Sequence, residues 1–289
     1  MAVARGLTAD GAGPPVEVLC VDSMQVYRGM DIGTAKPSAA DRAAVPHHLL
    51  DLVAPGEDFT VARYQAEAQA ALAGIEARGS RALLVGGTGL YFQAVVDRFT
   101  PPGRYPEVRA ELEAEPDTVA LHQRLHEIDP LAASRMLPSN RRRVVRALEV
   151  SLGSGHPFST FGPGIATFPP TRFRIAGLWL PRGVVGGRIE ERFRTMLDSG
   201  LVGEVGRLAA RAGGMSRTAR QALGYREVLA HLEEGAPMAA AAADAVRRTK
   251  AFARRQRVWW RRDPRITWYG AAENPLAVVP ALLGDWKRP

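Results

Sequence analysis

Asp22 is the residue whose position most suggests chemistry, because it ends the apolar run VEVLCVD that begins at Val16. Ser23, Met24 and Gln25 follow it directly. A carboxylate at the end of a buried strand can act as a general base toward a ligand held beside it. The same carboxylate can instead cap the turn or helix that follows, and this structural interpretation is the better one for Asp22 taken alone.

A second candidate is the turn GGTGLY, residues 86–91, which follows the apolar run ALLVGG. Its glycines allow backbone N–H groups and the Thr88 hydroxyl to approach a bound anion, although close packing is the better interpretation of the glycines alone. Asp22 and this turn both follow predicted strands. A parallel sheet would bring them to the edge where such sheets bind ligands.

The positive charge is concentrated near the C-terminus. Residues 247–265 hold nine basic residues and one acidic residue, which together account for the whole net charge of +8. In the rest of the chain the numbers of basic and acidic residues are equal. On a helical wheel the cations share one side, while Phe252, Gln256, Trp259 and Trp260 lie opposite. The aromatic residues among these are predicted to be core anchors of the helix more than platforms for base stacking. One-sided basic charge is typical of a surface that follows a phosphate backbone.

A shorter basic helix is predicted within NRRRVVRALEV. Arg142, Arg143 and Arg146 share one side of it, and Val144 and Val145 belong to its apolar underside. The spacing alone leaves two interpretations open, a solvated helix face and a nucleic-acid contact.

The order of elements predicts an α/β fold. Apolar runs expected to be buried parallel strands alternate with helical patterns, as in a parallel sheet with helices on both faces. The strands are 16–22, 82–87 and 173–180, and the helical stretches include 61–79 and 187–213.

The composition of the chain changes between the second and third predicted strands. Residues 101–170 are charged, helical and punctuated by proline, which predicts an inserted helical subdomain. The predicted α/β core is then formed by residues 1–100 and 171–289.

Composition excludes several classes of protein. No apolar run approaches the ~18 residues of a membrane span, and the N-terminus has no secretory signal. The single Cys20 lies inside an apolar run and is predicted to be a buried, inert thiol, which fits a cytoplasmic protein. His47 and His48 have no ligands at metal-binding spacing around them, so we do not assign them a metal.

Several long motifs closely resemble the tRNA dimethylallyltransferases, also called tRNA isopentenyltransferases or the IPP transferase family. They cover nearly the full chain and include VDSMQVYRGMDIGTAKPS, VPHHLLDLVAPGEDFTVARY, LLVGGTGLYFQAVVD, NRRRVVRALEV, SRTARQALGYREVL and TKAFARRQRVWWRRDPRITW. The resemblance implies a P-loop NTPase-like fold. It also implies transfer of a dimethylallyl group from its diphosphate to N6 of the adenine 3′-adjacent to the tRNA anticodon.

The resemblance also assigns roles to residues. Asp22 would be the general base, and Thr88 would face the reacting centre. Contact with tRNA is implied for Asp22, Ser23, Met24, Gln25, Arg109, Arg142, Arg143, Val144, Val145, Arg146, Arg247, Arg248, Lys250, Arg254 and Arg255. The expected partners are a tRNA anticodon stem-loop and dimethylallyl diphosphate, with Mg2+ inferred from the diphosphate chemistry and a monomer as the expected state.

The chemistry is consistent with these roles. An exocyclic adenine amine is a weak nucleophile whose proton becomes acidic only as the N–C bond forms. A carboxylate with an ordinary pKa can therefore accept this proton late in the reaction. Asp22 therefore needs position more than unusual acidity. The adenine must also leave its base stack to reach the enzyme.

One expected element is missing from the sequence. Residues 1–289 contain no GxxxxGK[ST] motif, so the residues that bind the diphosphate are not identified, and activity of the chain as written is an open question. We expect such a motif to be encoded in frame upstream of Met1, which the DNA sequence would test. The alternatives are a non-catalytic RNA-binding remnant of such an enzyme, and an enzyme acting on free adenine nucleotide, which the basic helix disfavours.

Overall fold

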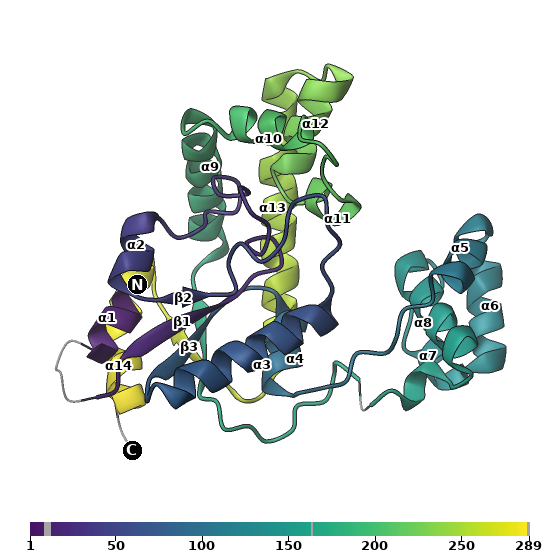
Figure 1. Cartoon of the computed structure of the whole chain (residues 1–289), viewed down its shortest axis with the longest axis horizontal. Coiled ribbons are helices and arrows are strands. Elements are labelled where there is room, and N and C mark those ends of the chain that lie inside the picture. Colours follow the sequence, from purple (N-terminus) through teal and green to yellow (C-terminus); the bar gives the residue numbers. More distant parts are fainter. Residues whose placement is uncertain (9–12, 163, 288–289) are drawn as a thin grey trace. The chain divides into compact units, whose positions relative to one another are not determined.

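The computed structural model describes residues 1–8, 13–162 and 164–287. Two compact units are present (Figure 1). One consists of residues 1–96 together with 170–289, and the other of residues 97–169. These bounds lie close to those expected for the α/β core and the helical insertion.

The larger unit contains two parallel sheets. In the first the strand order is β2-β1-β3, with β1 (Val16–Val21) between β2 (His47–His48) and β3 (Arg81–Gly86). In the second, β4 (Ile175–Trp179) pairs with β5 (Ile266–Gly270). The predicted strands are confirmed within two residues at each end. β2 and β5 were not predicted, because a two-residue strand and the mixed run ITWYG carry little periodic signal.

β1 is buried on both faces, as expected for a central parallel strand. One set of its side chains faces α3 (Val61–Ala77), and the other packs in a cluster with Ala4 of α1 (Ala2–Thr8). The first set is Leu19 and Val21, and the second is Val16, Val18 and Cys20. Helices therefore cover both faces of this sheet, which confirms the predicted fold class.

Further helices complete the larger unit. They are α2 (Ala39–Ala44), α4 (Gly89–Val96), α9 (Arg182–Asp198), α10 (Leu201–Ala209), α11 (Arg217–Arg220), α12 (Tyr225–Glu234), α13 (Met238–Trp260), the 3-10 helix η2 (Pro275–Val278) and α14 (Val279–Lys287). The helical stretch predicted over 187–213 is interrupted at Gly200, whose φ of 97° is left-handed. No helix in the described part of the chain is long and apolar enough to cross a membrane.

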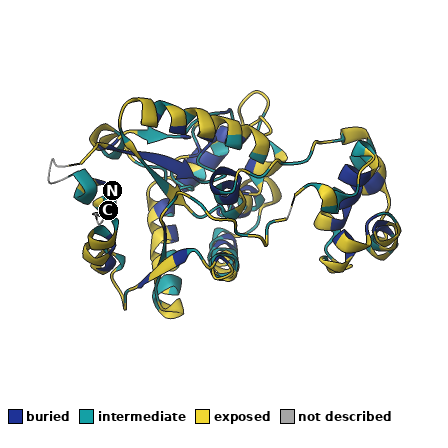
Figure 2. Cartoon of the chain, turned by 90° about the horizontal axis from the view of Figure 1, so that it is seen from below, coloured by how far each residue is buried: buried dark blue, intermediate teal, exposed yellow. Residues whose placement is uncertain are grey.

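The smaller unit is helical around its own apolar core. Its elements are α5 (Pro106–Ala114), α6 (Thr118–Ile128), α7 (Pro130–Ser134), α8 (Arg141–Ser154) and the 3-10 helix η1 (Phe158–Thr160). Leu112, Leu121, Leu125 and Leu148 pack at its centre. Figure 2 shows the buried residues of these helices turned toward one another. The buried core gives this unit an interior of its own, separate from that of the sheets.

At the end of β1 remote from Asp22, the buried carboxylate of Glu17 links this strand to β2 and to the C-terminal end of α3. Glu17 is 5% exposed, accepts two hydrogen bonds from Arg78, and lies 2.7 Å from His48 Nε2. The Arg78 hydrogen bonds, aided by His48 and opposed by burial, lower the pKa of Glu17 from 4.5 to about 2. The ionised carboxylate is therefore the form that stabilises the fold.

The free energy of unfolding is expected to depend on pH through Glu17. Its stabilisation is fully present above the unfolded pKa of 4.5 and is lost as pH falls toward the folded pKa of about 2. Urea unfolding between pH 6 and pH 2 should therefore give a steeper acid loss for the native chain than for Glu17→Gln. Identical acid profiles for the two proteins would contradict this assignment.

Candidate active site

Asp22 lies at the carboxyl end of β1, where its side chain organises the next turn. Its Oδ1 accepts hydrogen bonds from the backbone N–H of Met24 at 2.7 Å and of Gln25 at 3.2 Å. Its Oδ2 has no hydrogen-bond partner within the described residues, and the residue is half-buried. The structural and the chemical interpretations of Asp22 are thus compatible, since one oxygen holds the turn and the other is available to a substrate.

Thr88 joins the turn after β3 to the turn after β1. Its Oγ1 accepts a hydrogen bond from the Ser23 N–H at 3.1 Å, and its own N–H donates to the Val21 carbonyl. The expectation that Asp22 and Thr88 meet at one edge of a parallel sheet is therefore confirmed. Thr88 thus holds the N–H of Ser23, and Asp22 holds the N–H of the next residue, Met24, so the backbone after β1 is fixed from both turns.

The glycines of the GGTG turn are required for packing. A Cβ on Gly86 would lie 2.0 Å from the Val21 carbonyl oxygen, and one on Gly89 would lie 2.1 Å from Trp259 Nε1. Gln256 of α13 also donates to the Gly87 carbonyl at 2.9 Å. The packing interpretation of these glycines and the anchoring role predicted for Trp259 are confirmed, whereas Phe252, at 37% exposure, is not a core anchor.

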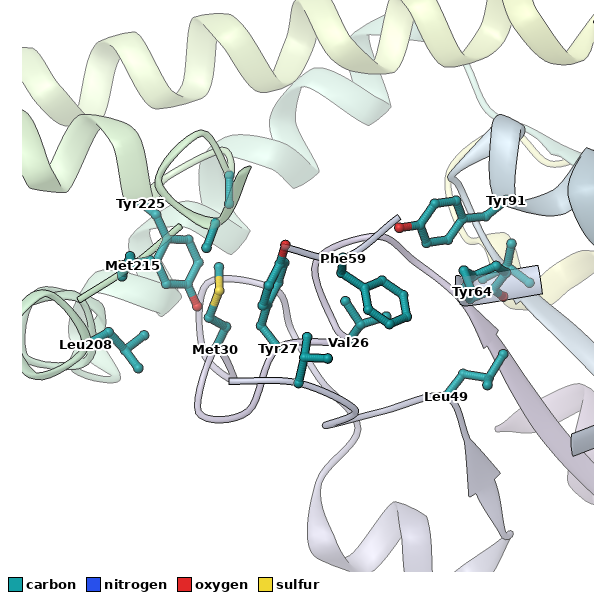
Figure 3. Packing of buried hydrophobic residues seen from close by; sticks show 14 of the residues in the cluster. Val26, Tyr27, Met30, Leu49, Phe59, Tyr64, Tyr91, Leu208, Met215 and Tyr225 are labelled. Carbon is teal, nitrogen blue, oxygen red and sulfur yellow. The ribbon is translucent and has the colours of Figure 1, made fainter. Parts of the chain in front are cut away.

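A stacked pair of tyrosines, Tyr64 and Tyr91, lies in the buried core of the larger unit (Figure 3). Tyr64 and Tyr91 stack with centroids 4.0 Å apart, and Tyr64 Oη donates to the Cys20 carbonyl. Burial, followed by the charge of Asp22, raises the pKa of Cys20 to about 12, so its thiol stays protonated. The predicted burial of Cys20 is confirmed, and a protonated thiol fits the inert role expected of it.

An open cleft of about 1140 Å3 lies between the segment 31–42, Leu180 and α9. Its lining includes Arg188 and Arg192, which are exposed and have no ion pair or hydrogen bond within the described residues. Lys36 and Arg42 also line the cleft, but both already pair with Asp51. Among the described residues, the charged side chains of the lining without an ion pair are therefore Arg188, Glu191 and Arg192, all of α9.

The cleft adjoins the Asp22 turn through Gln25. The Gln25 side-chain amide donates to the carbonyls of Thr34 at 3.1 Å and Ala35 at 3.4 Å, and Ala35 lines the cleft. Gln25 thus links the Asp22 turn to a loop of the cleft, whereas Asp22 itself does not line the cleft.

Arg188 and Arg192 were missed by the sequence analysis. They lie four residues apart and so share a face of α9, the helix that follows the carboxyl end of β4. Helical spacing combined with that position could have identified them. The sequence alone did not single out Arg188 and Arg192, because charged residues are common on the exposed faces of helices.

The basic residues predicted on α13 differ in their surroundings. Arg247 and Arg248 pair with Asp244, and Lys250 pairs with Glu190. Arg254 and Arg255 are exposed and have no ion pair within the described part of the chain. They are therefore the residues of this set most available to an added phosphate.

The helical unit presents a similar contrast. Arg109 and Arg146 both pair with the buried Glu149, whereas Arg142 and Arg143 are exposed and without an ion pair in the described residues. The inclusion of Val144 and Val145 among residues that contact tRNA is wrong for their side chains. Both are buried, at 0% and 1% exposure, because they form the underside of α8 and pack in the core of this unit.

The acidic residues and histidines of the larger unit form no metal centre within the described residues. Within the described residues no group of three or more His, Cys, Asp or Glu side chains could hold a metal ion. His48 lies against Glu17, and His47 Nδ1 lies 2.7 Å from the Val45 carbonyl. No residue is assigned to Mg2+, and no chemical step below depends on it.

The fold and the site define a class of protein, a P-loop NTPase-like α/β enzyme that carries a helical insertion. A solved tRNA isopentenylpyrophosphate transferase from Bacillus halodurans is similar to this chain, with 34% identity, a TM-score of 0.67, and coverage of 98% of this chain and 93% of that one. A eukaryotic dimethylallyltransferase acting on tRNA, at 23% identity and a TM-score of 0.77, shares the fold.

Sequence comparisons give the family. The family model "IPP transferase" matches residues 25–263. A tRNA dimethylallyltransferase of Kineococcus radiotolerans is 47% identical over 276 residues, which span 94% of this chain and 86% of that protein. One from Acidothermus cellulolyticus is 48% identical over 272 residues, spanning 92% and 84%. The chain belongs to the IPP transferase family, which confirms the resemblance inferred from its motifs.

Proposed function

We propose that this chain transfers a dimethylallyl group from dimethylallyl diphosphate to N6 of the adenine 3′-adjacent to the anticodon of tRNA. The observation that carries the proposal is the Asp22 carboxylate at the end of β1. One of its oxygens is fixed by the turn, the other has no hydrogen-bond partner within the described residues, and Gln25 links this turn to a loop that lines the basic cleft. Membership of the IPP transferase family supplies the reaction class.

In the proposed reaction the lone pair of the adenine N6 attacks C1 of the dimethylallyl group. The C1–O bond breaks, its electrons leave with the diphosphate, and the N6 proton passes to Asp22 Oδ2. Thr88 supports this geometry by holding Ser23, the residue after the base.

The leaving diphosphate needs positive charge. Arg188 and Arg192 are cations of the cleft that have no ion pair in the described part of the chain, and guanidinium groups bind phosphate oxygens with paired hydrogen bonds. We assign them to the diphosphate. This assignment is independent of the P-loop motif that the sequence analysis did not find in residues 1–289, and Mg2+ remains a prediction drawn from the chemistry.

The tRNA would be held by exposed arginines on each unit. Arg254 and Arg255 serve the α/β unit, and Arg142 and Arg143 serve the helical unit. Paired residues such as Arg109 and Arg146 would instead keep their helices in shape. An unpaired surface cation releases a counterion from the nucleic acid without breaking a protein ion pair, so it contributes more to binding.

Transfer of a labelled dimethylallyl group tests the proposal. Label is expected on an anticodon stem-loop and not on AMP, because the basic surfaces recognise an extended polyanion. Binding of the stem-loop without transfer would favour the alternative, an RNA-binding remnant. Transfer to AMP at an equal rate would favour an enzyme of free nucleotides.

Replacing Arg254 and Arg255 together by glutamine is expected to weaken tRNA binding and to reduce its salt dependence. The slope of log K against log salt should fall by about 1 for each arginine that contacts a phosphate. Fluorescence anisotropy with a labelled stem-loop at several salt concentrations measures both quantities.

A matched control removes the same charge elsewhere. Arg63 of α3 and Arg172 are exposed and lie outside the proposed tRNA surface, and each pairs with a glutamate on the surface. Their double glutamine variant should bind the stem-loop with nearly the native salt slope. Equal losses in both double variants would mean that net charge alone, and not the α13 surface, governs binding.

A further inference from the structure

The GGTG turn, residues 86–89, is held by α13 as well as by β1. Gln256 Nε2 of α13 donates a hydrogen bond to the Gly87 carbonyl at 2.9 Å. A Cβ at Gly87 would lie 2.3 Å from the same nitrogen, so the amide lies directly against the backbone of the turn. Trp259, one turn further along α13, packs equally closely on Gly89. The turn is thus enclosed between a strand and one face of a helix.

Burial does not fix this turn by itself. Val85, the residue before the turn, is 50% exposed, and Leu90, the residue after it, is 38% exposed. The two consecutive glycines also leave the backbone with many accessible conformations. The order of the turn therefore depends on specific contacts, and the hydrogen bond from Gln256 is one that reaches it from a separate element.

The turn passes its position on to the backbone beside Asp22. Thr88, the residue after Gly87, accepts the Ser23 N–H at 3.1 Å and donates its own N–H to the Val21 carbonyl at 3.3 Å. Ser23 follows Asp22 directly, so a shift of Thr88 moves the backbone that carries the carboxylate. The hydrogen bond from α13 to the turn therefore bears on the orientation of Asp22.

We propose that Gln256 is a positioning residue, whose amide holds the GGTG turn in the register that directs Asp22 Oδ2 toward the adenine N6. The inference rests on the proposed function, in which Asp22 is the general base. It deepens that function because Arg254 and Arg255, which are exposed on the same helix, would bind tRNA phosphates. One helix then both binds the RNA and orders the turn that supports the general base.

Gln256→Met tests the proposal, because methionine keeps the length and the neutral charge of the side chain and removes its hydrogen-bond donor. We expect kcat for prenyl transfer to fall by about 3- to 10-fold, the equivalent of one lost hydrogen bond, while the affinity for the stem-loop stays within about twofold of native. A side chain with a merely structural role would lower the melting temperature and leave kcat of the folded enzyme unchanged.

Gly87→Ala disturbs the same contact from the other side. The added methyl group would displace the Gln256 amide, which is the end of a flexible side chain, so the fold should be retained. The expected loss of kcat is similar to that of Gln256→Met. The double variant should lose little more than either single variant, because both remove one contact. Losses that multiply in the double variant would contradict a shared contact.

A variant of the general base shows whether the effect passes through Asp22. Gln256→Met should have almost no effect on the residual turnover of Asp22→Asn, since no carboxylate remains to be directed. A full loss in that background would overturn the proposal. The control is Gln65→Met, which removes another hydrogen bond from a glutamine amide to a backbone carbonyl, that of Ala94 at 2.6 Å. It should keep the native kcat.

Hydrogen exchange of the Ser23 amide provides a readout that needs no prenyl transfer. It should be about 3- to 10-fold faster in Gln256→Met than in the native chain and unchanged in Gln65→Met. Native exchange together with native kcat in Gln256→Met would overturn the positioning role and leave the proposed function intact. If exchange is faster but the native chain transfers nothing to the stem-loop, the proposed function fails and the role of Gln256 in ordering the turn stands.

Discussion

Replacing Asp22 by asparagine is expected to lower kcat for prenyl transfer by about 10²- to 10⁴-fold, the usual contribution of a general base. Asparagine keeps an oxygen at Oδ1 for the N–H groups of Met24 and Gln25. It removes only the negative oxygen that would receive the N6 proton. The melting temperature and the affinity for the stem-loop should therefore stay close to those of the native chain.

Asp22→Ala separates the two roles of the side chain. It removes the base and also the hydrogen bonds of the turn. We therefore expect the same loss of turnover, together with a free energy of unfolding that is lower by about 1–2 kcal/mol and a lower melting temperature. Affinity for tRNA should remain largely intact, as measured by anisotropy. A large loss of tRNA affinity in the asparagine variant would show that Asp22 binds the RNA instead of accepting a proton.

The second large effect is expected on α9. Changing Arg188 and Arg192 together to glutamine should lower kcat/KM for dimethylallyl diphosphate by about 10²- to 10³-fold, because charge on the leaving group is stabilised by groups of this kind. Initial rates at varied donor concentration, with tRNA saturating, measure the change. Affinity for the stem-loop alone should be little altered.

Arg194 provides the control for this experiment. It is an exposed arginine of the same helix, but it does not line the cleft. Arg194→Gln should keep nearly the native kcat/KM for the donor. If the Arg194 variant lost as much activity as the double variant, a general electrostatic effect of α9 would account for the data better than a diphosphate site.

The part of the site formed by consecutive residues was predictable from sequence. The apolar run of β1 and the polar residues after it place Asp22 at a strand end, and a parallel sheet then requires Thr88 to lie nearby. The helical face of α8 likewise predicts which side is basic. In both places local periodicity determines the geometry, because β1 and α8 each have a clear apolar pattern.

The rest of the site depends on contacts between distant residues. Glu204 meets the loop at 31–33 from across more than 170 positions of sequence, and no local pattern signals which N–H groups a buried carboxylate will receive. Arg109 is similar, since its partner Glu149 lies on another helix. Such pairings follow from tertiary packing, so composition and spacing could mark these residues as charged but not as paired or free.

The distance between Asp22 and the adenine N6 is the quantity on which the proposed proton transfer most depends. A structure of the protein bound to an anticodon stem-loop would measure it directly. We predict that the adenine following the anticodon is turned out of its stack, with N6 within about 2.6–3.2 Å of Asp22 Oδ2. An adenine that stays stacked in the loop, or an N6 that meets other side chains while Asp22 points away, would contradict the account.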